Sequence, residues 1–323
     1  MITVAETLKN LEAAIRLSYE DTETTFVALE LLSDITGKTK TQLLSSLKSP
    51  LTPQAIIRLS KRLDQIAKRV PVQYILGFVQ FYGNKFKVSK EVLIPRQETE
   101  TLVETAVSRL LAKALSSKKA LNVLDIGTGS GAITISIANT CSRLLEKAKQ
   151  ISFYAVDISA AALRAAADNS RTVITEKDWL AQLHFIHADL YPESKQATPQ
   201  RFDIITANLP YVSTDEYKSL KAHIKKYEPK QALFGGKTGT EIVERMLDGL
   251  KPRLKPSGVA IIELPPIHEK WLRKKCESLM FSTEKVDQKG FIWVIQPVRH
   301  RQAQPLAQHT RHLQPDPFAR FSR

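Results

Sequence analysis

The sequence predicts an α/β fold in which a mostly parallel sheet, covered by helices on both faces, follows a small helical domain. Apolar runs and helical segments alternate from Thr99 to Ile295, and this alternation is typical of parallel strands joined by crossover helices. Apolar residues before residue 70 recur at helical spacing instead. A length of 323 residues is also ordinary for two domains.

The composition argues against several classes of protein. No apolar run is long enough to span a membrane, and the N-terminus lacks the basic and then apolar pattern of a signal peptide. Cys141 and Cys276 are isolated and have no close histidine partners, so we expect neither a metal site nor a disulfide framework. We therefore expect a cytoplasmic protein, and we expect a monomer.

The charge favours an acidic partner. The net charge is +14 and the calculated pI is about 9.6. The lysines are dispersed, however, and no stripe of arginine and aromatic residues accompanies them. Nucleic acid is therefore a possible partner but is not favoured. A solvated basic surface explains the charge better, and such a surface could also attract an acidic protein.

Residues 1–77 form the predicted helical domain. Apolar residues recur at helical spacing between residues 8 and 15 and again between 56 and 66. Thr52 is placed to cap the second of these helices, with Pro53 at its first position. No cluster of histidine, cysteine or acidic residues suggests chemistry there, so we expect this domain to recognise a substrate.

The next segments are a linker and the larger domain. Residues 78–95 alternate apolar and polar residues around Gly83 and Asn84, which predicts a β-hairpin with these two residues in its middle. Residues 96–297 hold the alternating strands and helices and form the predicted catalytic domain. Residues 298–323 are rich in Gln, Pro, His and Arg and poor in apolar residues, which predicts a disordered basic tail.

A glycine-rich loop opens the sheet. It follows a short apolar strand that carries Asp125, and a helical segment comes after it. The spacing of the glycines is neither that of a dinucleotide-binding loop nor that of a P-loop, so a ligand with an ammonium and a carboxylate fits better than a phosphate. The loop consists of Gly127, Thr128, Gly129, Ser130 and Gly131.

Acidic residues recur where the next strands are predicted to end. Asp157, followed by Ile158, and Asp189, followed by Leu190, each close an apolar run. Each acid could cap a helix instead. Ligands of open α/β sheets bind at the carboxyl ends of the strands, where such acids hold ribose hydroxyls. A site for a ribose, an adenine and an amino acid, without a phosphate, indicates S-adenosylmethionine.

A short tetrapeptide suits the binding of a planar –NH2 group. Asn208, Leu209, Pro210 and Tyr211 follow the apolar run 202–207, which predicts a buried strand. The Asn208 carboxamide offers an acceptor, and the Leu209 carbonyl cannot pair with a continuing strand because Pro210 has no N–H. The Tyr211 ring offers a flat face. The alternative is a strand followed by a proline turn that binds nothing.

Five motifs resemble those of the release factor glutamine methyltransferases, the HemK/PrmC family, and the similarity covers the chain to about Pro297. It implies a class I, Rossmann-like methyltransferase domain with a seven-stranded, mostly parallel sheet. It also implies methylation of the glutamine in the Gly-Gly-Gln motif of peptide chain release factors, with S-adenosylmethionine as the donor. The motifs are VPVQYILG (70–77), FYG (81–83), LIPRQETE (93–100), YEP (227–229) and ALFGG (232–236).

Site residues follow from this resemblance. The glycine loop with Asp125 would face the methionine part of the cofactor, and the acids at 157 and 189 with their following residues would hold the ribose and the adenine. Asn208 and the Leu209 carbonyl would accept hydrogen bonds from the glutamine –NH2, with the next two residues packed on its plane. Arg96, Glu98 and Thr99 would either shape the floor of the pocket, with Arg96 and Thr99 binding the substrate, or hold the domains together.

Two departures keep other functions open. The family usually has proline where this chain has Leu209, and the leucine form also resembles enzymes that methylate the exocyclic amine of adenine in RNA or DNA. The family usually has glycine soon after the residue equivalent to Glu263, where this chain has Pro265 and Pro266, which should end the strand. A non-catalytic protein that binds S-adenosylmethionine is the second alternative.

Overall fold

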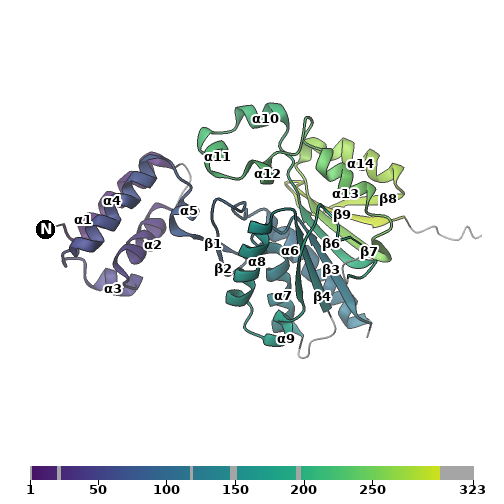
Figure 1. Cartoon of the computed structure of the whole chain (residues 1–323), viewed down its shortest axis with the longest axis horizontal. Coiled ribbons are helices and arrows are strands. Elements are labelled where there is room, and N and C mark those ends of the chain that lie inside the picture. Colours follow the sequence, from purple (N-terminus) through teal and green to yellow (C-terminus); the bar gives the residue numbers. More distant parts are fainter. Residues whose placement is uncertain (1, 20–22, 117–118, 146–150, 194–197, 299–323) are drawn as a thin grey trace, which may run out of the picture.

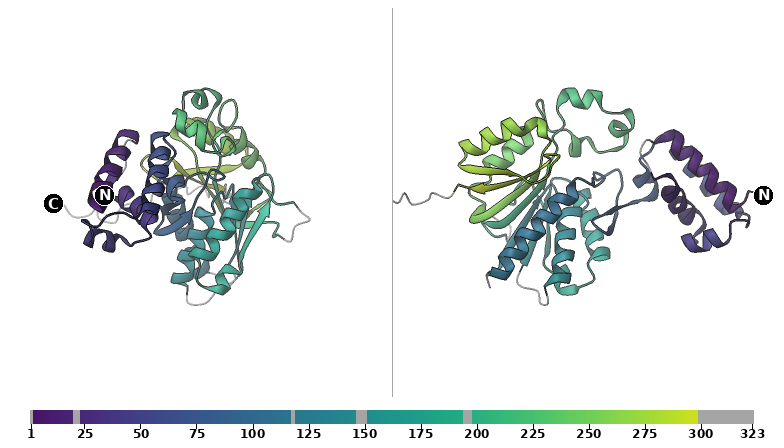
Figure 2. Two further views of the ribbon diagram at one scale, coloured as in Figure 1. Left: turned by 60° about the vertical axis from the view of Figure 1, so that its left-hand side comes forward. Right: turned by 180° about the vertical axis from the view of Figure 1, so that it is seen from behind.

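The computed structural model describes residues 2–19, 23–116, 119–145, 151–193 and 198–298. Figures 1 and 2 show a group of helices at the N-terminus, a short hairpin and a larger α/β part. The predicted basic tail, from residue 299 onward, lies outside the described residues. Within the described ranges no helix is both long and apolar enough to cross a membrane.

The N-terminal helices enclose a core of their own, which includes Leu11, Leu31 and Ile66. Thr52 caps α4 as predicted, because its hydroxyl accepts a hydrogen bond from the Ala55 N–H at 3.2 Å. The helices are α1 (Val4–Ser18), α2 (Thr24–Thr36), α3 (Lys40–Ser45), α4 (Pro53–Ala67) and α5 (Val72–Leu76).

A hairpin of β1 (Phe78–Phe81) and β2 (Asn84–Lys87) follows α5. The turn lies one residue earlier than predicted, because Tyr82 and Gly83 form it and Asn84 already belongs to β2. Tyr82 and Gly83 have φ of 47° and 69°, as a two-residue hairpin turn with two left-handed residues requires.

Asparagine side chains fix the hairpin to the α/β part. The Asn169 carboxamide accepts from the Lys87 N–H at 2.8 Å and donates to the Lys87 carbonyl at 3.0 Å, so it pairs with β2 as a strand would. It also donates to the carbonyl of Ser130 at 2.9 Å. Asn139 donates to Asn84 at 2.9 Å. The hairpin is therefore held against the glycine loop and its helix.

The described part of the α/β domain has a seven-stranded sheet in the order β5-β4-β3-β6-β7-β9-β8. β9 runs antiparallel to both of its neighbours and the other pairs are parallel, so the predicted mostly parallel sheet is confirmed. The strands are β3 (Leu121–Ile126), β4 (Ile151–Asp157), β5 (Leu183–His187), β6 (Phe202–Asn208), β7 (Leu254–Glu263), β8 (Phe281–Lys285) and β9 (Ile292–Pro297).

Helices cover both faces of this sheet, with an apolar core on each face. α6 (Thr99–Ser116) and α7 (Ala132–Leu144) pack on one face, beside α8 (Ala160–Val173), and α13 (Glu241–Asp248) and α14 (Glu269–Ser278) pack on the other. Short helices lie in the connections: α9 (Lys177–Leu180), α10 (Thr214–Ser219), α11 (Ala222–Tyr227), α12 (Lys230–Leu233) and η1 (Pro266–His268).

The segment between β6 and α13 reaches from the sheet toward the N-terminal helices. Figure 1 shows α10, α11 and α12 grouped together at this side of the molecule. The Tyr227 hydroxyl donates to the carbonyl of Lys68, just after α4, at 3.1 Å. This contact joins two parts of the chain that are 159 residues apart in sequence.

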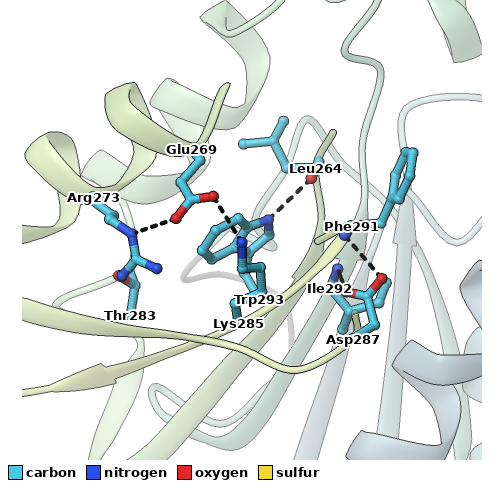
Figure 3. Close-up of polar contacts among 9 residues, drawn as sticks. All are labelled: Leu264, Glu269, Arg273, Thr283, Lys285, Asp287, Phe291, Ile292 and Trp293. Atoms are coloured by element: carbon cyan, nitrogen blue, oxygen red, sulfur yellow. Dashed lines mark hydrogen bonds and ion pairs between the residues drawn. The ribbon is translucent and has the colours of Figure 1, made fainter. Parts of the chain in front are cut away.

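The end of β7 is fixed by β9. β7 ends at Glu263, as the two following prolines predict. The buried indole of Trp293 donates from Nε1 to the Leu264 carbonyl at 3.1 Å (Figure 3). The Leu264 N–H donates to the Phe291 carbonyl at 2.8 Å. Glu269 bridges Arg273 and Lys285 beside this indole. Glu263 is therefore held in place although two prolines follow it closely.

Candidate active site

A cavity of about 340 Å³ lies at the carboxyl ends of the parallel strands, where open α/β sheets bind ligands. Its wall combines apolar side chains from the strand ends with a few polar groups. The described lining residues are Glu91, Val92, Leu93, Ile126, Gly127, Gly129, Val156, Asp157, Ile158, Ser159, Ala161, Ala162, Ala188, Asp189, Leu190, Asn208, Leu209, Pro210, Pro229, Gln231, Ala232, Ile242 and Arg245.

Asp157 organises the glycine loop beside this cavity. One carboxylate oxygen accepts from the Gly129 N–H and the other from the Ser159 N–H, both at 2.8 Å. Burial raises the pKa of Asp157, and these hydrogen bonds oppose the shift. The Ile158 N–H also stabilises the charged carboxylate. Because a carboxylate has about four acceptor positions, one remains for a hydroxyl group of a ligand.

Asp125 lies behind the glycine loop rather than in the cavity wall. It is fully buried and accepts from the hydroxyls of Thr128 and Thr206, both at 2.7 Å. Burial raises its pKa to about 6. Because side chains alternate along a strand, Asp125 shares the face of Val123, which α6 and α7 cover. Its visible role is to tie the loop to β6.

The other end of the cavity carries Asp189 and Leu190. The Asp189 carboxylate pairs with the Arg245 guanidinium at 2.7 Å, with both side chains about half exposed. Leu190 has φ of 66°, a left-handed conformation that is unusual for a residue with a branched side chain. Such backbone conformations cluster at binding sites, and Leu190 lines the cavity.

The tetrapeptide 208–211 begins at the last residue of β6, and its first three residues line the cavity. A Cβ on Gly127, whose φ is 72°, would lie 3.0 Å from Leu209 Cδ2, so the loop and the tetrapeptide are in close contact. The backbone of Val212 pairs with the segment 233–235, and a Cβ on Gly235 would lie 2.5 Å from the Pro210 carbonyl oxygen. The glycines of both motifs thus allow these backbones to approach each other.

Hydrogen bonds with Thr99, and through it with Glu263, fix the Asn208 carboxamide. Its Nδ2 donates to the Thr99 hydroxyl at 3.1 Å, and this hydroxyl donates to Glu263 Oε2 at 2.6 Å. Glu263 is 2% exposed, and this burial raises its pKa to about 7. Asn208 and Glu263 are register partners on β6 and β7, and Thr99 is the first residue of α6.

Arg96 and Tyr211 both lie close enough to Glu263 to interact with it electrostatically. Arg96 Nη2 lies 2.7 Å from both carboxylate oxygens of Glu228, whose side chain is 3% exposed. The Arg96 motif is thereby tied to the YEP motif. Burial raises the pKa of the half-buried Tyr211, and the Glu263 carboxylate acts in the same direction.

The charges of the cavity fit S-adenosylmethionine, which carries positive charge and no phosphate. Of the described lining residues, the charged ones are Glu91, Asp157, Asp189 and Arg245, and Arg245 already pairs with Asp189. A phosphate would meet an acidic site, whereas a sulfonium and an ammonium would be attracted to it. The apolar wall would accept the adenine ring.

The structure brings most of the predicted site residues to one cavity. Those in its wall are Gly127, Gly129, Asp157, Ile158, Asp189, Leu190, Asn208, Leu209 and Pro210. Those behind the wall or beside it are Asp125, Thr128, Ser130, Gly131, Tyr211, Arg96 and Thr99. The sequence did not identify Arg245 or Glu263 as site residues, because each meets its partner only through the fold.

Comparisons with known proteins find relatives for both parts of the chain. Residues 117–311 match the model of a methyltransferase domain, and residues 6–77 match that of the PrmC N-terminal domain. The release factor glutamine methyltransferase of Bacillus anthracis is 32% identical over 72% of this chain and 77% of its own length. The Bacillus subtilis enzyme of the same name is 33% identical over 82% of this chain and 85% of its own length. The Koribacter versatilis enzyme of the same name is 34% identical over 81% of this chain and 86% of its own length.

The solved structures agree on the fold. The catalytic domain of hMettl16, in complex with an RNA hairpin, matches with a TM-score of 0.50 over 77% of this chain and 82% of that one. At 13% sequence identity this likeness shows the fold alone.

Proposed function

Because the chain belongs to the release factor glutamine methyltransferase family, we propose that it methylates the glutamine side chain of the Gly-Gly-Gln motif in a peptide chain release factor. The methyl donor is S-adenosylmethionine. We also propose that it works as a monomer in the cytoplasm. The observation that carries the proposal is the Asn208 carboxamide, which lines the cavity beside the glycine loop while Thr99 engages its nitrogen.

Asn208 and Leu209 bind the reacting nitrogen in this proposal. With Nδ2 engaged by Thr99, the Asn208 Oδ1 is the atom that accepts one N–H of the glutamine. The Leu209 carbonyl accepts the other, because β6 and its pairing with β7 end at Asn208 and this carbonyl lies beyond the ladder. Pro210 and Tyr211 pack on the plane of the amide. Leu209 can replace the proline of relatives because the backbone carbonyl performs this role.

An amide nitrogen is a poor nucleophile, since its lone pair is delocalised into the carbonyl. Two acceptors on its N–H bonds return electron density to the nitrogen and complement the charge that develops there. S-adenosylmethionine supplies an electrophilic methyl group on a sulfonium. Positioning of the two reactants can contribute up to about 7–11 kcal/mol. The surplus proton leaves the nitrogen for water, so the site needs no strong base.

The remaining cavity residues bind the donor in this proposal. Gly127 and Gly129 let the backbone approach its methionine part, and Asp157 accepts from a ribose hydroxyl. Ile158 and Leu190 enclose the adenine, with Asp189 at the edge of the cavity.

The experiment measures transfer of labelled methyl from S-adenosylmethionine to a purified release factor, to the same factor with its Gly-Gly-Gln glutamine changed, and to bulk RNA. Label on the intact factor that is lost with the changed glutamine supports the proposal. Label on RNA alone would overturn it in favour of an adenine methyltransferase, whose binding would also fall steeply with salt. No label on either substrate, with the donor still bound, would indicate the non-catalytic alternative.

A further inference from the structure

Glu263 is a buried acid next to the proposed catalytic asparagine, and the mechanism above gives it no role. It is 2% exposed, it ends β7, and it pairs in register with Asn208 at the end of β6. Paired residues of neighbouring parallel strands point to the same face of the sheet. Both side chains meet Thr99 at the start of α6.

We propose that Thr99 and Glu263 are positioning residues that fix the Asn208 carboxamide with its oxygen toward the acceptor amide. This inference rests on the proposed function, because it assigns the groups that orient the same catalytic side chain. It also assigns Thr99 a role through Asn208 rather than in direct substrate binding.

The Thr99 hydroxyl carries a single proton. The hydroxyl can donate one hydrogen bond and accept two. Its oxygen lies 2.6 Å from Glu263 Oε2, a distance typical of a hydroxyl that donates to a carboxylate. The hydroxyl oxygen therefore has only lone pairs left for the 3.1 Å contact with Asn208.

That constraint decides which way round the carboxamide lies. A carboxamide turned by 180° would place Oδ1 against the lone pairs of the hydroxyl, and two acceptors would face each other. Nδ2 must therefore point to Thr99. Since Oδ1 and Nδ2 are the two ends of one planar group, Oδ1 points away from Thr99 and is available to the substrate.

The orientation holds while Glu263 is ionised. A protonated Glu263 can donate to the Thr99 oxygen, which frees the hydroxyl proton to donate to Oδ1 of a turned Asn208. Burial raises the pKa of Glu263 to about 7. The titratable groups coupled to it are Arg96 and Glu98, before α6, and Tyr211, after β6.

Three variants at Thr99 and Glu263 separate positioning from packing. Thr99→Val keeps the shape of the side chain and removes the hydroxyl, so we expect kcat to fall about tenfold, the value of one hydrogen bond. The KM for S-adenosylmethionine should stay within about twofold. Thr99→Ser keeps the hydroxyl and should restore kcat. Glu263→Gln has no ionisation and should lose the acidic limb of the kcat profile.

A double-variant cycle tests whether Thr99 acts through Asn208. When Asn208→Ala is already present, Thr99→Val should cause no further loss of kcat, because no carboxamide remains to be oriented. An independent loss of rate would indicate a structural role. The inference is overturned if Thr99→Val leaves kcat unchanged, or if Thr99→Ser is as slow as Thr99→Val.

A readout without turnover keeps this test separate from that of the proposed function. The side-chain –NH2 resonances of Asn208, assigned with Asn208→Ala, should shift as the pH passes about 7 in the wild type, with the apparent pKa of Glu263. The shift should vanish in Glu263→Gln. If the chemical shifts of the Asn208 –NH2 group do not change with pH in the wild type, the inference is overturned. If the wild-type protein methylates no release factor, only the proposed function is overturned.

Discussion

Arg96→Ala is the substitution whose cost follows most directly from the structure. Arg96 Nη2 lies 2.7 Å from both oxygens of Glu228, whose side chain is 3% exposed. Removal of one partner of a buried pair costs about 3–5 kcal/mol, because it leaves a desolvated charge without its counter-ion. The Arg96 side chain is 37% exposed, so water will reach Glu228, and we expect about 3 kcal/mol.

The free energy of unfolding is measured by guanidinium titration, followed by the fluorescence of the tryptophans of the α/β part. Adding Glu228→Gln to Arg96→Ala should recover a large part of the loss, because a neutral amide needs no counter-charge. The matched control is Arg171→Ala, which breaks the ion pair between Arg171 and Asp168. These side chains are 65% and 64% exposed, respectively. It should cost at most about 1 kcal/mol.

Two outcomes would contradict this prediction: Arg96→Ala costs no more free energy of unfolding than the Arg171 control, or the double variant is as unstable as Arg96→Ala alone. In either case the contact would not be what holds the YEP motif against the segment before α6. Arg96 would then be free to act on the substrate directly, which is the other role that the sequence allows.

Three further predictions concern the cavity and the network behind it. Asn208→Ala should lower kcat about 10²–10³-fold, as removal of one preorganised hydrogen-bonding group typically does, while titration shows a much smaller loss of affinity for S-adenosylmethionine. Gly127→Ala should weaken that affinity, because its φ of 72° disfavours a Cβ that would lie 3.0 Å from Leu209; calorimetry that gives the wild-type affinity would contradict this. Between pH 4.5 and about 7 the folded protein holds a proton on Glu263 that the unfolded chain has lost, so this group makes the free energy of unfolding fall as pH rises. Glu263→Gln should flatten that fall in denaturant titrations at several pH values, and an unchanged slope would exclude the effect.

The ionisation of Glu263 has opposite effects on stability and on activity. Ionised Glu263 destabilises the fold, because a charge is buried, and the same ionised form orients Asn208. Functional sites commonly retain such destabilising groups. Activity that requires the ionised form should therefore rise over the pH range in which Glu263 lowers stability.

Features with a local cause could be predicted from the sequence. Thr52 caps α4 because a threonine before a proline and an apolar helix satisfies the first N–H groups. β7 ends at Glu263 because prolines follow it. β4 and β6 end at Asp157 and Asn208, the polar residue that follows each apolar run. In each case neighbouring residues determine the outcome.

Features that depend on distant partners could not be predicted. Thr99 meets Asn208 across 109 residues and Glu263 across 164, and no local pattern encodes either contact. The position of Asp125, in contrast, follows from the alternation of side chains along β3. Asp125 lies on the same face of the sheet as Val123 and on the opposite face from Leu124, so its side chain points toward α6 and α7. The acid nearest to the glycine loop therefore lies behind it.

The central claim is best tested by locating the methyl group. A release factor incubated with the enzyme and S-adenosylmethionine is digested, and the peptide that contains Gly-Gly-Gln is fragmented in a mass spectrometer. The structure predicts one added methyl group on the side-chain nitrogen of that glutamine, and its loss with Asn208→Ala. A methyl group on another residue, or equal methylation by Asn208→Ala, would contradict the assignment of this site.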